Sequence, residues 1–213
     1  MANYLQLVNN VLVRLRQAPV STVTTTDYTG LIARYVNDAK RDIEDAWNWN
    51  ALKSTITETT AADSFQYVLT GAGQRYKILQ VFNDSRDTEM RMAPTTAMTK
   101  WFLTATPQRG IPMYYNINGV DPLGDPNVDV YPVPNGAYDL RFNLIIPQDD
   151  LLADTDVPLV PSYLIEQGAL VYALYERGED SAAREQQHYV GMLGTAIAQE
   201  EARELGSTDW VAT

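Results

Sequence analysis

The sequence predicts an α+β protein, in which an N-terminal and a C-terminal helix pair form a helical bundle and an antiparallel β domain is inserted between them. Two observations predict it. Apolar residues recur every three or four positions near both ends of the chain, as in amphipathic helices. Between them, apolar and polar residues alternate and β-branched residues are frequent, as in strands. The predicted bundle covers residues 1–50 and 160–206, and the insertion covers 51–159.

The N-terminal helix pair is predicted on either side of a short polar loop. The first helix covers residues 2–17 and stops before Pro19, which cannot continue a helix. The second begins at Thr26 or Asp27, since either side chain can cap a helix N-terminus, and extends to about Trp47. The apolar positions are Leu5, Val8, Leu12 and Leu15 in the first helix and Leu31, Tyr35, Ala39, Ile43 and Trp47 in the second.

The insertion is predicted to consist of short strands, with one short helix at residues 94–104. Asn135-Gly136 is the strongest turn signal and predicts a tight hairpin between the last two strands. The expected strands are Leu52–Thr60, Phe65–Leu69, Tyr76–Phe82, Glu89–Met92, Met113–Ile117, Val128–Val133 and Tyr138–Ile146.

The C-terminal helix pair is predicted from Ser162 onward. Its first helix ends at Gly178, which suits the left-handed position after a helix. The next begins at Asp180 or Ser181 and ends at Gly206, leaving 207–213 as a C-terminal tail. A ridge of small residues would let another helix approach this last helix closely. The ridge consists of Gly191, Gly194, Ala198 and Ala202.

Negative charge is concentrated in the last third of the chain. Residues 1–148 carry 14 Asp and Glu against 13 Lys and Arg, whereas residues 149–213 carry 13 against 3. Proteins that grip nucleic acid neutralise phosphates with basic side chains, and the sequence has no basic patch of that kind. We therefore expect DNA to slide past this protein without sequence-specific binding.

Several functional classes lack support in the sequence. The absence of cysteine excludes disulfides, thiol catalysis and Cys-ligated zinc. No signal peptide or apolar run of membrane-spanning length is present, so we expect no membrane association. The carboxylates near residues 149–156 lack the spacing of a calcium loop, and His188 has no evident catalytic partner. We expect no enzyme activity, no cofactor and no metal.

Two features keep other interpretations open. Aromatic residues at Trp47, Trp49, Tyr114, Tyr115, Tyr131 and Tyr138 would suit a sugar-binding platform, although core packing is the commoner role for such residues. Trp210 follows the predicted helix stop at Gly206, so nothing local would bury it. A Trp in this place docks either on its own chain or on a neighbouring subunit, and we expect Asp209, Trp210 and Val211 to dock on a neighbouring subunit or another protein.

Several stretches resemble the head-to-tail adaptor proteins of tailed bacteriophages, also called connector or neck ring proteins. The order and spacing of the stretches carry the resemblance, which covers most of the chain. They are Tyr4-Leu-Gln-Leu-Val-Asn-Asn-Val-Leu, Val36-Asn-Asp-Ala-Lys-Arg-Asp-Ile-Glu-Asp-Ala-Trp-Asn-Trp, Gly110-Ile-Pro-Met-Tyr-Tyr, Val130-Tyr-Pro-Val-Pro-Asn-Gly-Ala-Tyr and Asp156-Val-Pro-Leu-Val-Pro.

The resemblance implies a virion structural protein at the head-tail junction, assembled in the host cytoplasm. It implies a homo-oligomeric ring of about twelve copies, docked under the portal protein and above the next tail or neck component. The genome DNA would then pass through the ring, and we expect acidic side chains to face that channel. The candidates are Asp149, Asp150, Asp154, Glu200 and Glu201. The alternatives are a carbohydrate-binding or carbohydrate-cleaving virion protein and a phage assembly chaperone.

Overall fold

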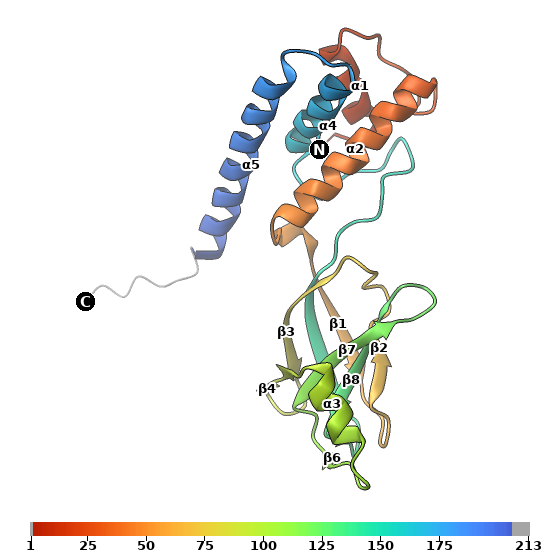
Figure 1. Ribbon diagram of the computed structural model, residues 1–213, viewed down its shortest axis with the longest axis vertical. Coiled ribbons are helices and arrows are strands. Elements are labelled where there is room, and N and C mark those ends of the chain that lie inside the picture. The colour runs from red at the N-terminus through yellow and green to blue at the C-terminus, as the bar shows by residue number, and fades with distance from the viewer. Residues whose placement is uncertain (1, 206–213) are drawn as a thin grey trace, which may run out of the picture. The chain divides into compact units, whose positions relative to one another are not determined.

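The computed structural model describes residues 2–205 and contains two compact units. The helical unit comprises residues 2–52 and 147–205 of the described chain, and the β unit comprises residues 53–146. Helices from both ends of the chain flank the β region in sequence, which confirms the predicted α+β class (Figure 1). Residues 147–159, which the sequence analysis grouped with the insertion, pack with the helices.

Four α-helices build the helical unit: α1 (Tyr4–Arg14), α2 (Asp27–Ala46), α4 (Ser162–Glu176) and α5 (Ala182–Leu205). The predicted cap of α2 is confirmed, because the Thr26 side chain accepts a hydrogen bond from the Thr29 N–H at 3.1 Å. Gly178 has the expected left-handed backbone, with φ of 65°. Helix α1 ends three residues earlier than predicted, because Arg16 also adopts a left-handed φ, of 59°.

The core of the helical unit lies between α1, α2 and α4, whose facing apolar side chains are fully buried. Gly168 of α4 lies where α4 closely approaches both α2 and α5. A methyl group placed there would lie 3.0 Å from the Ala39 Cβ of α2 and 3.3 Å from the Tyr189 ring of α5. The buried side chains include Leu7, Val8, Val11, Ile32, Val36, Ile43, Leu164 and Ile165. A short 3-10 helix, Asn50–Leu52, ends the N-terminal part.

The β unit contains two four-stranded sheets and a two-stranded one. The first has the order β1 (Lys53–Thr59), β10 (Asp139–Ile145), β3 (Lys77–Asn83), β4 (Thr88–Glu89). The second has the order β2 (Gln66–Val68), β8 (Pro126–Tyr131), β7 (Tyr114–Val120), β5 (Arg91–Met92). The third pairs β6 (Arg109–Gly110) with β9 (Val133–Pro134). The longer strands pair antiparallel, while β5 with β7 and β6 with β9 form two-residue parallel pairs.

The predicted hairpin at Asn135-Gly136 is wrong. The strands before and after it, β8 and β10, belong to different sheets, and both bury apolar side chains in one shared core. The turn is instead held against the end of β1, since the Thr60 hydroxyl donates to the Gly136 carbonyl at 3.0 Å and accepts from the Tyr138 N–H at 2.9 Å. The expected strand Glu89–Met92 is also divided, because β4 joins the first sheet and β5 the second.

The predicted short helix in the insertion is confirmed as α3 (Thr95–Phe102). Its Met98 is buried with Ala93 and Tyr131, and Trp101 stacks on Tyr131 with ring centroids 4.8 Å apart. Helix α3 therefore closes a small aromatic core of its own within the β unit.

Candidate functional site

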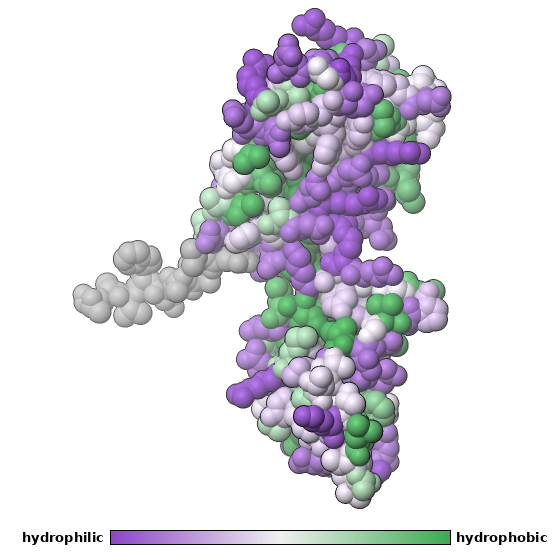
Figure 2. Space-filling model, in the orientation of Figure 1, coloured by the Kyte–Doolittle hydropathy of each residue, from purple (hydrophilic) through white to green (hydrophobic). Residues whose placement is uncertain are grey.

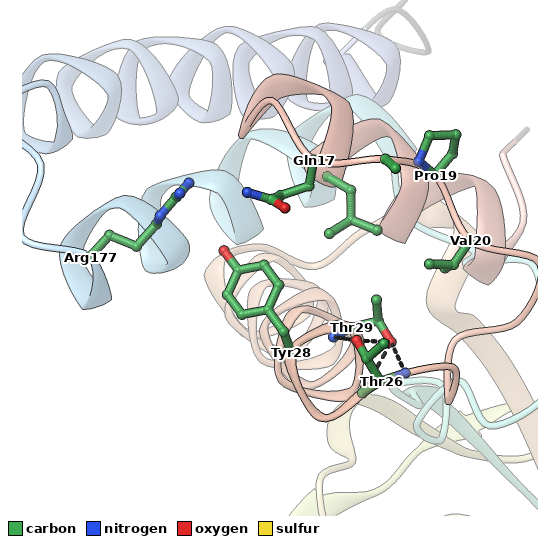
Figure 3. Close-up of a pocket in the computed structure, with 9 residues that line it drawn as sticks. Gln17, Pro19, Val20, Thr26, Tyr28, Thr29 and Arg177 are labelled. Carbon is green, nitrogen blue, oxygen red and sulfur yellow. Dashed lines mark hydrogen bonds between the residues drawn. The ribbon is translucent and has the colours of Figure 1, made fainter.

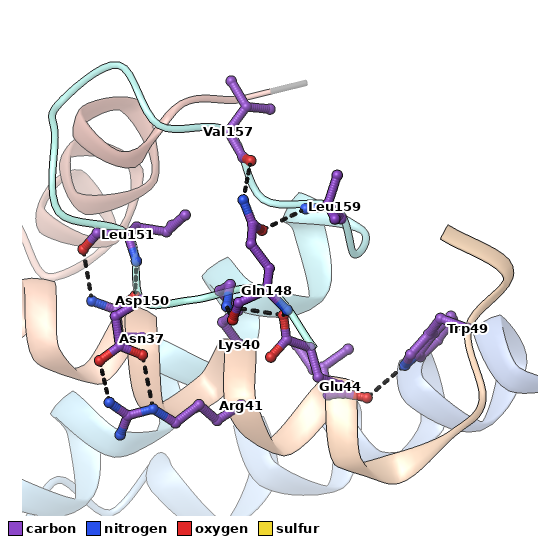
Figure 4. A network of polar contacts seen from close by, with 11 residues as sticks. Asn37, Lys40, Arg41, Glu44, Trp49, Gln148, Asp150, Leu151, Val157 and Leu159 are labelled. Carbon is purple, nitrogen blue, oxygen red and sulfur yellow. Dashed lines mark hydrogen bonds and ion pairs between the residues drawn. The ribbon is translucent and has the colours of Figure 1, made fainter. Parts of the chain in front are cut away.

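The segment from residue 147 to residue 159, which we call the strap, is fastened to α2 by a row of polar contacts (Figure 4). The strap carries three of the five acidic side chains predicted to face a DNA channel. Its anchoring decides which of these carboxylates remain available for that role.

The innermost contact of the strap is a buried ion pair on α2. Lys40 and Glu44 are 0% and 1% exposed, and their charged atoms lie 2.9 Å apart. The Lys40 ammonium donates to the Gln148 carbonyl at 2.6 Å, and the Gln148 N–H donates to the Glu44 carboxylate at 3.3 Å. A buried charge is stable only when paired and hydrogen-bonded, so the strap backbone completes the pair.

Two further α2 side chains hold the strap beyond the buried pair. The Asn37 amide accepts from the Leu151 N–H at 2.9 Å and donates to the Leu151 carbonyl at 3.0 Å. Arg41 forms a two-pronged contact with Asp150, whose first oxygen lies 2.9 Å from the Arg41 Nε. The Asn37 side chain thus bonds both backbone polar groups of Leu151, as the backbone of a neighbouring strand would. The two contacts from the Arg41 guanidinium hold the Asp150 carboxylate in place.

The turn of the strap is closed by its own aspartates. The Asp156 carboxylate accepts from the Leu152 N–H at 2.8 Å and the Ala153 N–H at 2.7 Å. The Asp154 carboxylate accepts from the Val23 N–H at 3.1 Å, and its carbonyl accepts from the Leu5 N–H of α1. These carboxylates therefore tie the strap to itself and to the N-terminal residues.

Helix α5 presents a long exposed face in this single chain. Along its described length only Ala182 and Ala196 are buried, and Val190 is 59% exposed. Gly191, Gly194 and Ala198 all lie on the exposed side, and a methyl group at either glycine would meet no other described element within 4 Å. Hydrophobic side chains lie among hydrophilic ones along this helix (Figure 2). The face has the small residues of a helix-packing surface but no packing partner within the described chain.

A model of the SU10 adaptor protein family matches residues 2–211. The chain belongs to this family. Membership points to a phage adaptor, that is, a structural component of the virion that interacts with other components. No curated protein matches the chain.

In this family member, the five acidic candidates have unequal surroundings. Asp149 and Glu201 are exposed and have no ion-pair partner in the part of the chain that the structure describes. Asp150 and Asp154 are engaged in the strap contacts above. Glu200 is half-buried, pairs with Arg203 at 2.5 Å and accepts from the Asn50 amide at 3.0 Å. Asp209, Trp210 and Val211, the docking candidates, lie outside the described residues.

Residues 2–205 allow the metal, membrane and sugar-binding interpretations to be compared with the structure. No group of three or more metal-ligating side chains converges there. None of the helices in that range has the length and apolar composition of a bilayer span. Of the aromatic residues considered for a sugar platform, Trp49, Tyr115, Tyr131 and Tyr138 are buried. The Trp49 indole donates to the Ile43 carbonyl at 2.6 Å, so this ring closes the C-terminal end of α2.

Sequence reasoning missed the polar residues of α2 that hold the adaptor's strap. Charged residues are expected to face solvent. Lys40 and Glu44, together with Asn37, instead lie buried within the regular apolar stripe of α2. A signal was available, because Lys40 and Glu44 are four residues apart and follow the apolar spacing of Val36 and Ile43.

Loss of the Asp156 charge is expected to alter the acid sensitivity of the adaptor. Hydrogen bonds from the Leu152 and Ala153 N–H groups lower the pKa of the Asp156 carboxyl. The ionised Asp156 carboxylate therefore contributes fully to the folding stability above its unfolded-state pKa of about 4. This contribution is lost as the pH falls through the lower pKa of the folded state. Urea unfolding of Asp156→Asn should show reduced stability at pH 7 and a smaller difference from the natural protein near pH 3. Equal differences at both pH values would contradict this role.

Proposed function

We propose that this chain is a head-to-tail adaptor whose copies form a ring of about twelve, docked under the portal and above the next tail or neck component. The observation that carries the proposal is the exposed small-residue face of α5 in a member of an adaptor family. A helix face with closely spaced small residues allows another helix to approach closely, and an identical copy alongside supplies such a helix.

The ring encloses the channel through which the genome passes, and the distribution of charge suits passage rather than binding. Asp149 and Glu201 are the candidates to face the channel, because both are exposed and have no ion-pair partner among residues 2–205. Exposed carboxylates repel phosphates, so they would leave DNA few contacts to release during packaging and ejection. This role requires no turnover of any molecule.

Attachment to the portal or to a neighbouring copy is assigned to Asp209, Trp210 and Val211. Tryptophan is among the residue types that contribute most binding energy at protein interfaces. The assignment rests on sequence alone, because these residues lie outside the described chain.

The direct test is to mix the purified protein with portal rings and to measure native mass and rotational symmetry by electron microscopy. The proposal predicts a complex in which about twelve copies sit on one face of the portal. Free protein that remains monomeric does not contradict it, since many ring proteins assemble only on their platform. A protein that never associates with the portal, or that is absent from mature particles, contradicts it and favours the assembly chaperone.

Replacing Gly194 by leucine is expected to block ring assembly while leaving the fold intact. Leucine is a better helix former than glycine by about 0.8 kcal/mol. Apart from the backbone of α5 itself, no atom of residues 2–205 lies within 4 Å of a methyl group at Gly194. The unfolding free energy should therefore stay equal or rise, whereas copies should fail to associate on the portal. Gln199→Leu, on the same helix outside the ridge, is the matched control and should assemble normally. Normal assembly of Gly194→Leu would exclude this face as the contact between copies.

A further inference from the structure

A cavity of about 440 Å³ lies where the loop after α1 meets the first turn of α2 (Figure 3). Its lining combines apolar groups with the Tyr28 ring and with four polar or charged residues. The apolar residues are Leu12, Ala18, Pro19 and Val20, and the polar or charged ones are Gln17, Thr26, Thr29 and Arg177. The Tyr28 hydroxyl is buried and has no hydrogen-bond partner within the described chain. It points toward the side of the cavity formed by Gln17 and Arg177 (Figure 3). A buried hydroxyl without a hydrogen bond costs free energy, so the Tyr28 hydroxyl is a candidate to form a hydrogen bond with a ligand in the cavity.

A second cavity, of about 640 Å³, shares Gln17 and Arg177 with the first and is basic. Arginines from three segments line it, together with two carboxylates, Glu179 and Glu185. The arginines are Arg14, Arg16, Arg177 and Arg184. Arg16 is exposed, has no ion pair among residues 2–205, and stands at a left-handed backbone position. In a chain of net charge −11, this concentration of arginines is exceptional and leaves an excess of positive charge.

We propose that the apolar cavity receives the Trp210 side chain of a second copy of this chain, with Asp209 of that copy facing the neighbouring arginines. An indole needs an apolar slot with one hydrogen-bond acceptor for its N–H group. The cavity supplies both, because the Tyr28 oxygen is the unused acceptor. A carboxylate one residue away would meet the excess positive charge around Arg177.

The tail of the same copy cannot reach this cavity. Helix α5 begins beside the basic cavity, at Ser181 and Arg184, and spans 24 residues, or about 36 Å. Its far end lies beside Asn50, past the other end of α2, since Glu200 accepts from the Asn50 amide. Trp210 follows Leu205 by five residues, which extend at most about 18 Å. Only the Trp210 of another copy can therefore fill this cavity.

This contact joins two different surfaces of identical copies, namely the C-terminal tail of one copy and the apolar cavity of the next. Each copy therefore inserts its tail into one neighbour and binds the tail of another. Such head-to-tail contacts close into a ring when the rotation between copies allows it. The inference rests on the proposed function in that copies must lie side by side. It goes further by naming the receiving cavity and by assigning the tail to a neighbour rather than to the portal.

Disulfide trapping tests the contact directly, because the natural chain has no cysteine. Two single variants, Ala18→Cys and Val211→Cys, are mixed and assembled on cysteine-free portal rings under mild oxidation. We expect a disulfide between the two kinds of copy, and its loss when Trp210→Ala is added to the Val211→Cys copy. Rings that assemble without this disulfide, or a disulfide that survives Trp210→Ala, overturn the inference while leaving the adaptor function intact. Failure to assemble without either cysteine contradicts the adaptor function itself.

A peptide of residues 206–213 provides the second test, with a chain ending at residue 205 as the receptor. Tyr28→Phe in the receptor should weaken peptide binding about fivefold, the value of one hydrogen bond. Tyr163→Phe is the matched control, because Tyr163 is a half-exposed tyrosine at the opposite end of α4 from Arg177. Thermal unfolding of both receptors should remain close to that of the unsubstituted receptor. Equal peptide affinity of the Tyr28→Phe and Tyr163→Phe receptors would remove Tyr28 from the site.

Discussion

Replacing Lys40 by methionine is expected to destabilise the helical unit by about 3–5 kcal/mol, the usual cost of removing one partner of a buried ion pair. The Glu44 carboxylate would lose its 2.9 Å contact with the Lys40 ammonium while remaining 1% exposed. The Gln148 carbonyl would lose its 2.6 Å hydrogen bond at the same time. Urea unfolding followed by circular dichroism measures the loss, and release of the strap should appear as faster amide exchange at Leu151 and Leu159.

The matched control is the double variant Lys40→Met with Glu44→Leu. An apolar pair of similar volume leaves no unpaired buried charge, so we expect it to recover part of the lost stability. If the double variant is less stable than Lys40→Met alone, the loss of stability in Lys40→Met does not come from the loss of the ion-pair partner of the buried Glu44 carboxylate. A single variant within about 0.5 kcal/mol of the natural protein, the range of ordinary surface substitutions, would contradict the buried pair itself.

Replacing Gly168 by valine is expected to be the second most damaging single change, at about 3 kcal/mol, because overpacking a close helix contact forces backbone shifts. Its first carbon would lie 3.0 Å from the Ala39 Cβ, and that atom belongs to the α2 framework and has no rotamer to adopt. The two branch methyl groups would press further on α2 and on the Tyr189 ring.

Gly191→Val is the matched control for Gly168→Val, since both glycines lie inside helices. Outside the backbone of α5, no described atom lies within 4 Å of a methyl group at Gly191, so we expect the unfolding free energy of Gly191→Val to change by less than about 0.5 kcal/mol. Thermal unfolding of the two variants should therefore separate clearly. Similar melting temperatures would show that α4 has room to move away from α2.

The helices were predictable from sequence because each carries its own signals. Thr26 supplies the cap of α2, Gly178 accepts the left-handed turn after α4, and the apolar spacing identifies the faces toward the core. These signals are local, within one or two turns of the residue concerned. The early end of α1 was not predictable, because it depends on Arg16 adopting a conformation that rarely suits an arginine.

The pairing of strands was not predictable, since it depends on residues distant in sequence. Asn135-Gly136 has the composition of a hairpin turn, yet β10 pairs with β1 and β3 on either side and is unavailable to β8. The contacts between the strap and α2 were not predictable for the same reason. Asn37 and Leu151 are 114 residues apart, and only the folded chain brings the amide to the backbone that it binds.

The surroundings of the acidic residues refine the explanation of the chain's charge. Sequence alone treated Asp149, Asp150 and Asp154 as equivalent, whereas Asp150 and Asp154 are engaged by Arg41 and by the Val23 N–H. Asp149 and Glu201 remain exposed, and these are the two carboxylates proposed to face the channel. The regional negative charge therefore has two roles, of which one holds the strap and the other is proposed for the channel.

A symmetry-resolved electron cryomicroscopy reconstruction of the head-tail junction in mature particles would show the proposed ring itself. We expect a closed ring of about twelve copies of this chain beneath the portal, with the α5 faces of adjacent copies in contact. A junction that lacks this polypeptide, or copies that attach singly without touching one another, would contradict it.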